Sequence, residues 1–120
     1  MDKAQAFHAF WAGFDLPAYD ESTVPEDAPF PRITYQVSTG SWDDAILLST
    51  SVWYYSRSWE QISQKADEIA AAIGWAGSLL PTDDGAIWLK RGSPFAQRMS
   101  DPNDMVRRIL LNVVADYKTI

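Results

Sequence analysis

The sequence predicts an α+β fold, with a mainly antiparallel β-sheet and two helices packed on one of its faces. Two segments repeat apolar residues at helical spacing, several others alternate apolar and polar residues, and short turn motifs separate the latter. The expected element order is α-β-β-α-β-β-β, in which short turns favour antiparallel neighbours. With 120 residues, 47% of them hydrophobic, the chain has the size of one self-sufficient domain spanning residues 1–120.

The first helix is predicted over about Lys3–Phe14. Asp2 can cap its start, and Gln5 stands where a capping box needs it. Aromatic residues recur at helical spacing and form one stripe: Phe7, Phe10, Trp11 and Phe14. Pro17 stops the helix, and residues 16–31 hold four of the seven prolines, which predicts an extended crossing segment.

A long β-hairpin is predicted next. Its first strand begins at Arg32, where the apolar period switches to two, a turn region follows over residues 39–44, and the second strand covers Ala45–Tyr55. Eleven residues reach roughly 35 Å at about 3.3 Å each, more than a small domain needs for its own core. We therefore expect part of this hairpin to project.

The second helix follows the pattern of a capping box over residues 58–61. Four apolar residues recur on one side of it: Ile62, Ala66, Ile69 and Ile73. Gly74 suits its C-terminal cap. The next segment, residues 74–77, has a bulky Trp75 where a small, glycine-rich turn is expected.

Three further strand segments complete the predicted sheet. Leu79–Leu80 is a short apolar piece, residues 83–85 form a turn, and Ala86–Arg91 reads as a strand. Residues 92–103 are predicted as a loop, because glycine and proline interrupt the pattern. In the last strand, alternate residues share one face: Arg107, Ile109, Leu111, Val113, Ala115 and Tyr117.

Composition excludes several classes of function. The chain has no cysteine, so thiol catalysis, thiolate metal sites and disulfides are ruled out, which suits a reducing compartment. The N-terminus lacks the pattern of a secretion signal, and no apolar run approaches the roughly 18–20 residues that span a bilayer. The net charge of −6 argues against a sequence-reading nucleic-acid binder. Six tryptophans favour self-association mildly.

No catalytic or metal-binding set emerges, and we expect no cofactor. His8 is the single histidine and sits inside the first helix, where an exposed or rim role is favoured. Paired acids at residues 43–44, 83–84 and 101–104 fall in turns, where Asp binds the local backbone. The sequence contains neither a nucleophile elbow nor a phosphate-binding glycine loop.

One predicted loop, residues 91–99, has an unusual composition. Arg, Phe and Met are favoured at buried protein interfaces and have little use in a loop that only connects strands. We interpret it as an interface, with an intramolecular tuck as the alternative. Trp53 and Tyr55 share a strand face and suit an interface or core packing more than base stacking. The candidate contact residues are Arg91, Ser93, Pro94, Phe95, Gln97, Arg98, Met99, Trp42, Trp53 and Tyr55.

Several segments together resemble a known family. These are the run Leu89–Met99 with Asp101-Pro102, the segment Arg107–Asn112, the opening residues 6–20, and the centre around residues 34–59. In combination they are similar to small tail-completion or head–tail joining proteins of long-tailed bacteriophages and prophages of Gram-positive hosts. The likeness covers nearly the whole chain, although none of its motifs encodes a reaction.

The resemblance implies a fold of the tail-terminator type and a structural role without catalysis. Such proteins close into rings, commonly hexamers, that cap the tail tube and dock it to the head. It also implies tail-tube and head-connector proteins as partners, passage of DNA without specific binding, no membrane, and residence in the virion and, during assembly, the host cytoplasm. A ring contact joins two different patches, for which the hairpin and residues 91–99 are the candidates.

Two other functions stay open. A small regulatory module could bind a peptide or small molecule with its tryptophans, which requires a deep pocket lined by Trp53, Trp59 or Trp88. An enzyme would require His8 in a cleft beside a carboxylate.

Overall fold

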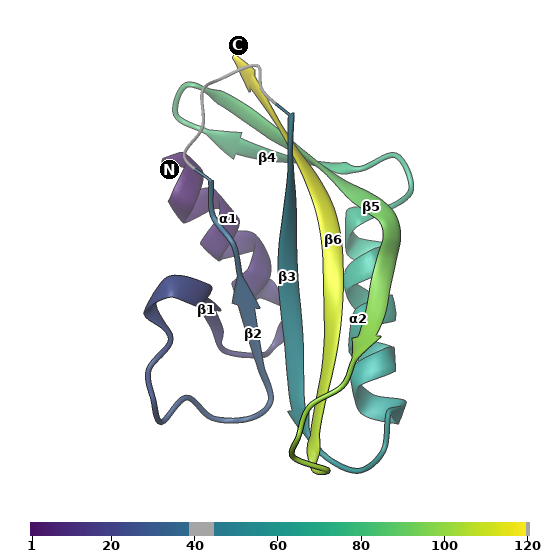
Figure 1. Cartoon of the computed structure of the whole chain (residues 1–120). Helices are drawn as coiled ribbons and strands as arrows, with labels where there is room; N and C mark the ends of the chain where they lie inside the picture. The colour runs from purple at the N-terminus through teal and green to yellow at the C-terminus, as the bar shows by residue number, and fades with distance from the viewer. Residues whose placement is uncertain (39–44, 120) are drawn as a thin grey trace.

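The computed structural model describes residues 1–38 and 45–119, in which two α-helices lie behind a long β-sheet (Figure 1). The helices are α1 (Lys3–Trp11) and α2 (Glu60–Ile73), with short 3-10 turns η1 (Ala12–Phe14) and η2 (Glu21–Thr23). The strands are β1 (Ala18–Asp20), β2 (Arg32–Tyr35), β3 (Ala45–Tyr55), β4 (Ser78–Thr82), β5 (Gly85–Met99) and β6 (Val106–Thr119). The predicted element order is confirmed, with β1 as the one addition.

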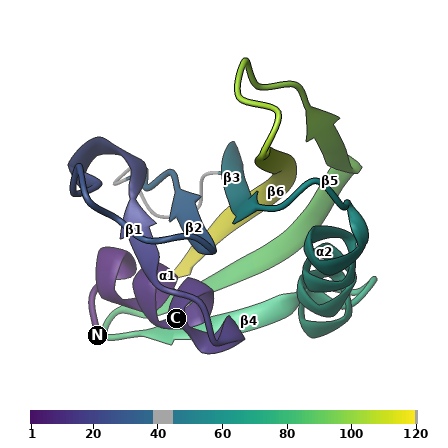
Figure 2. The same cartoon turned by 90° about the horizontal axis from the view of Figure 1, so that it is seen from below.

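The described strands form one sheet in the order β1-β2-β3-β6-β5-β4. Neighbours are antiparallel except β1 and β2, which pair in parallel with Ala18 opposite Ile33. The sheet curls, and both helices lie on its inner side (Figure 2). This is the predicted α+β fold.

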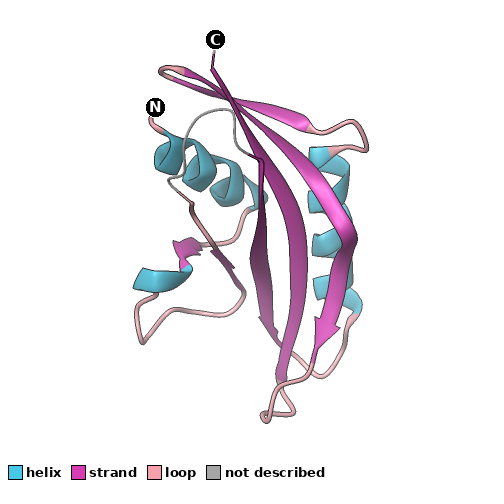
Figure 3. Ribbon diagram, turned by 45° about the horizontal axis from the view of Figure 1, so that its top comes forward, coloured by secondary structure: helices cyan, strands magenta, loops and turns pink. Residues whose placement is uncertain are grey.

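The core lies between the inner face of the sheet and the two helices. α2 buries the four residues that the apolar period selected, Ile62, Ala66, Ile69 and Ile73, and contacts β3, β5 and β6. From α1, Phe7 and Trp11 are buried, and the helix contacts β4 and β1. On β6, alternate residues from Ile109 to Tyr117 are all buried. The outer face of the sheet carries neither helix (Figure 3).

The two helix starts differ in how they are capped. Asp2 Oδ1 accepts the Gln5 backbone N–H at 2.8 Å, and the Asp2 backbone N–H donates to Gln5 Oε1 at 2.9 Å, which confirms the predicted capping box. At α2 the predicted capping box is wrong: Trp59 is the N-cap and makes no side-chain cap. Ser58 Oγ instead accepts the Glu60 N–H at 3.0 Å, so that a turn one residue earlier does the capping.

The projecting hairpin is a second expectation that the described residues contradict. β2 pairs with β3 only through Thr50–Trp53, whereas β3 pairs with β6 along its whole length, from Ala45 opposite Asp116 to Tyr55 opposite Val106. The long strand is therefore part of the sheet, because β6 continues where β2 ends. The predicted turn over residues 39–44, and with it Trp42, lies outside the described residues.

The turn between α2 and β4 accommodates Trp75 without needing a small residue there. Gly74 and Gly77 both have positive φ, of 74° and 88°. A Cβ on Gly77 would come within 2.4 Å of Trp88 Nε1 and 2.9 Å of the Leu89 carbonyl oxygen, so this position requires glycine. Trp75 between them points outward and is 90% exposed.

Candidate protein–protein interface

The segment with the unusual composition is a strand, not the predicted loop. β5 continues through it to Met99, paired with β6 on both sides of an irregularity between Arg91 and Ala96. Asn112 of β6 supports this bulge, since its Nδ2 donates to the Pro94 carbonyl at 2.9 Å and to Gln97 Oε1 at 3.1 Å. These side-chain hydrogen bonds hold the bulge to β6, where residues 92–95 have no register partner.

Most of the candidate contact residues of this segment are exposed. Arg91, Ser93, Pro94, Gln97 and Arg98 face solvent, whereas Phe95 and Met99 are half-buried. Phe95 packs against the core cluster, which agrees with the alternative that this segment packs within its own chain. The segment thus presents a polar and basic surface around one aromatic ring that is shared with the core.

Two arginines stack on Trp59 at the end of this segment. The guanidinium carbons of Arg98 and Arg107 lie 4.7 Å and 5.2 Å from the centre of the Trp59 ring. Arg107 also donates to the carbonyl oxygens of Arg57 (2.8 Å from Nη2) and Asp104 (2.8 Å from Nη1), which fixes it in place. Arg98 is exposed and forms no salt bridge with a described residue.

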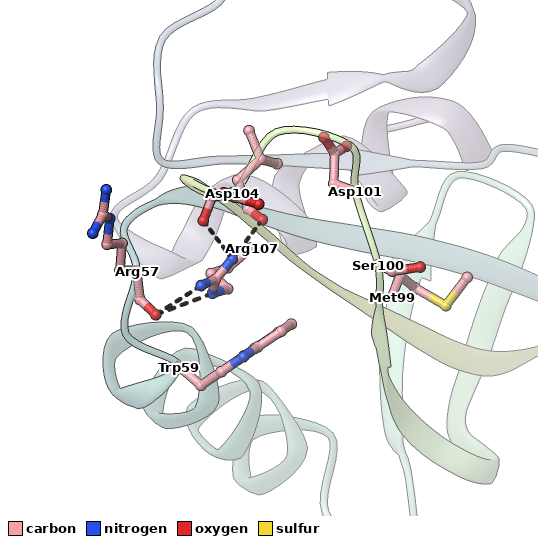
Figure 4. A pocket seen from close by; sticks show the side chains of 8 residues that line it. Arg57, Trp59, Met99, Ser100, Asp101, Asp104 and Arg107 are labelled. Atoms are coloured by element: carbon pink, nitrogen blue, oxygen red, sulfur yellow. Dashed lines mark hydrogen bonds between the residues drawn. The ribbon is translucent and has the colours of Figure 1, made fainter.

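A hollow of about 450 Å³ opens beside this stack (Figure 4). Its lining combines arginines, carboxylates and the tryptophan ring: Arg57, Trp59, Met99, Ser100, Asp101, Asp104, Val106 and Arg107. Asp101 Oδ1 accepts the Asn103 N–H at 2.9 Å, which confirms the predicted turn role for this acid.

Trp53 belongs to a second arginine–tryptophan stack on the opposite, outer face of the sheet. Arg32 and Arg108 lie over its ring at 5.4 Å and 4.7 Å, and its Nε1 donates to Thr34 Oγ1 at 2.9 Å. Burial lowers the pKa of Arg32, although the guanidinium stays charged at neutral pH. Tyr55, two residues further along, is 56% exposed. Trp53 is therefore held by its own chain, while Tyr55 is available to a partner.

Sequence reasoning missed an apolar cluster at the far end of the molecule. Leu79 and Trp88 are cross-strand partners that are 65% and 37% exposed, and the Trp88 Nε1 donates to the carbonyl of Ala76, the residue after the exposed Trp75. The signal in the sequence was Trp75 itself, because a large apolar residue in a tight turn has nothing of its own chain to cover it.

The surroundings of His8 bear on the enzyme alternative, which requires a cleft with a carboxylate beside this histidine. Its Nδ1 lies 2.9 Å from the Tyr35 hydroxyl, and the hollow beside it is lined by Met1, Ala4, Gln5, His8 and Ala9, without a carboxylate. Among residues 1–38 and 45–119, no group of three His, Asp or Glu side chains is arranged to hold a metal ion. In the same part of the chain, no helix has the length and apolar character needed to cross a membrane.

Comparison with known proteins identifies a structural likeness. The fold is similar to that of a chain in a solved structure described as "Virion of native gene transfer agent (GTA) particle", with a TM-score of 0.65 and 18% sequence identity. The match covers 97% of this chain and 91% of the other, so the likeness extends over the fold as a whole. No model of a protein family matches the sequence. No curated protein matches it either.

Proposed function

We propose that this chain is a structural protein of a phage, prophage or phage-like particle, and that it forms a ring which completes the tail and joins it to the head. The observation that carries the proposal is the fold shared, over 97% of the chain, with a chain of a gene transfer agent virion. The resemblance of residues 89–112 to tail-completion proteins points to the same class independently.

The surface supports assembly. Neither of the two described helices covers the outer face of the sheet, and Tyr55 and Leu47 are 56% and 66% exposed on it or at its border. Aromatic and arginine side chains are enriched at protein interfaces, and here they occur on both faces of the sheet. We assign the contacts of the ring to the candidate set named from the sequence: Arg91, Ser93, Pro94, Phe95, Gln97, Arg98, Met99, Trp42, Trp53 and Tyr55.

The partners follow from this role. Copies of the chain itself form the ring, of six subunits by resemblance, and tail-tube and head-connector proteins contact its two ends. The formal charge of −6 on every copy repels phosphates, which lets DNA pass without adhering. The protein resides in the virion and, during assembly, in the host cytoplasm.

The double variant Phe95→Ala/Arg98→Ala tests this function. In the particle-producing strain, we expect it to give tails of abnormal length or tails without heads, seen by electron microscopy, and fewer complete particles. Gln61→Ala/Gln64→Ala, at exposed positions on α2, is the matched control and keeps normal particles. Normal tail length and normal joining in the Phe95/Arg98 variant would contradict the interface assignment, and normal particles after deletion of the whole chain would contradict the function.

The hollow beside Trp59 supports a second candidate, a module that binds a peptide or small molecule. Its arginines and carboxylates could orient a polar ligand against the ring. The three tryptophans named for this reading do not converge, because Trp53 lies on the other face of the sheet and Trp88 lies against Ala76. Native mass spectrometry of the purified protein distinguishes the candidates: a co-purified ligand that is lost in Trp59→Ala favours the binding module.

A further inference from the structure

The outer edge of β5 is unpaired over its second half. β4 pairs with β5 only as far as Leu89, opposite Ser78, whereas β6 accompanies β5 on the other side to Met99. Within the described residues, the outward backbone groups of residues 90–99 therefore have no neighbouring strand. Such an edge readily accepts a further chain.

This edge is basic. Arg91 and Arg98 are exposed along it, and Lys90 precedes them. Four acids lie near this strand: Asp67 of α2 shares a small hollow with Arg98, Asp101 and Asp104 line the hollow beside Met99, and Asp116 of β6 lies 3.8 Å and 3.2 Å from the amines of Lys90 and Lys118. Residues 90–99 themselves carry three cations and no acid, so the strand edge itself is positive.

The opposite edge of the sheet is acidic. β1 ends the sheet on that side, and the surrounding segment, which we call the acidic edge, is residues 15–27 (Figure 1). It carries five carboxylates and no basic residue: Asp15, Asp20, Glu21, Glu26 and Asp27. Four of the five are exposed, and none forms a salt bridge with a described residue. Hydrogen bonds from Ser22 lower the pKa of Asp20 and keep it ionised.

The two terminal segments of the chain differ in charge in the same sense. Residues 1–31 contain six acids and one lysine, while residues 85–119 contain six basic residues and three acids. The strand order separates the negative residues 15–27 at the β1 edge from the positive residues 90–99 on the other side of the sheet. Two different, complementary patches on opposite sides of one subunit are what a head-to-tail contact requires.

We infer, on the basis of the ring proposed above, that the acidic edge of one copy docks against the second half of β5 in the next copy. The occupant is a second copy because both halves of the complementary pair stand on this chain. Electrostatic matching of this kind fixes orientation and speeds association. Residues 15–27 then form the patch that meets the second half of β5 in this contact.

Cysteine crosslinking tests the contact directly, because the chain has no cysteine of its own. The variant Glu26→Cys/Arg98→Cys, treated at high protein concentration with a short bis-maleimide, is expected to give a ladder of oligomers that stops at the ring size. Each single variant stays monomeric, and a mixture of the two gives only dimers. The control Asp84→Cys/Arg98→Cys, with an exposed acid on the β4–β5 turn, gives no ladder.

Three outcomes would overturn the inference: no ladder, an equal ladder in the control, or dimers from a single variant, which would indicate a symmetric contact. Sedimentation velocity of the unmodified protein separates these from a failure of the function. If the unmodified protein sediments as a ring but the 26–98 crosslink does not form, the contact is rejected and the proposed function stands. If the protein sediments as a monomer and the 26–98 crosslink does not form, the contact is rejected as well. The proposed function is rejected only if particles remain normal after deletion of the whole chain.

Charge reversal gives a second, independent test. Glu26→Lys/Asp27→Lys reduces the charge of residues 15–27 from −5 to −1, and Arg91→Glu/Arg98→Glu changes that of residues 90–99 from +3 to −1, so we expect at least a tenfold rise in the apparent dissociation constant for either variant alone. Mixing the two variants restores association. The lysines introduced at positions 26 and 27 of one variant then meet the glutamates at positions 91 and 98 of the other, and the unchanged edges of the two variants meet each other. Raising the salt from about 0.05 to 0.5 M weakens the natural contact through screening. Loss of association that mixing does not restore would contradict the charge pairing.

Discussion

The two halves of β5 make a direct comparison within one strand. Gly85–Leu89 pairs with β4 on one side and β6 on the other, and Gly85, Ile87 and Leu89 are buried. Residues 90–99 pair with β6 alone, and not one of them is fully buried. The first half is therefore part of the core, and the second half is surface that the fold holds in a fixed shape. Substitutions in the first should reduce stability, and substitutions in the second should reduce association.

The largest expected effect is that of Ile87→Ala. Ile87 is 0% exposed, and removing its buried carbons leaves a cavity, which costs about 2–5 kcal/mol of unfolding free energy. Urea denaturation followed by tryptophan fluorescence measures this loss. The control is Ser93→Ala in the second half, for which the change stays within about 0.5 kcal/mol. Equal losses in the two variants would show that both halves belong to the core.

The same contrast explains what the sequence could predict of the fold. α2 and β6 were predicted because their buried residues recur at a constant spacing along an entire element. The bulge in β5 was not, because Gly92, Ser93 and Pro94 have the composition of a loop and the residue that supports them, Asn112, lies on another strand. β1 was missed for a related reason: it has three residues in a proline-rich segment and gains its order from pairing with Ile33.

The candidate site was predictable to a similar extent. Composition alone singled out residues 91–99, and the exposure of Arg91 and Arg98 agrees with that choice. The stack of Arg32 and Arg108 on Trp53 could not be predicted, since these residues come from three different strands. The charge separation between the two edges was present in the sequence, but only the strand order gives it a direction.

The free energy of unfolding should depend on pH through a residue that contacts the first half of β5. Tyr117 is the partner of Ile87 in the first half, and burial raises its pKa to about 12. The unfolded chain loses this proton near pH 10, so that the folded state binds more protons between about pH 10 and 12. Stability is therefore expected to fall as pH rises through this window, by at most about 1.4 kcal/mol per pH unit from this group.

Tyr117→Phe checks the assignment, because it removes the titrating group and leaves the ring. The variant loses the hydrogen bond to the Ser38 carbonyl, 2.7 Å long, and is expected to be less stable at pH 8 but to show a shallower decline above pH 10. Urea unfolding at half-unit steps of pH measures both slopes. Identical slopes in the variant and the natural protein would assign the alkaline decline to other groups, such as Tyr35 and Tyr54, whose pKa values burial also raises.

The smallest expected effect on stability is that of Arg91→Ala. Arg91 is exposed at the start of the unpaired edge and forms no salt bridge with a described residue, so its removal should change the unfolding free energy by no more than about 0.5 kcal/mol. The same variant should nevertheless weaken self-association in sedimentation velocity, because the edge loses a positive charge that the acidic edge of a neighbour would meet. A stable fold with weakened association locates the role of this residue outside its own subunit. Loss of both together would mean that the second half of β5 supports the fold as the first half does.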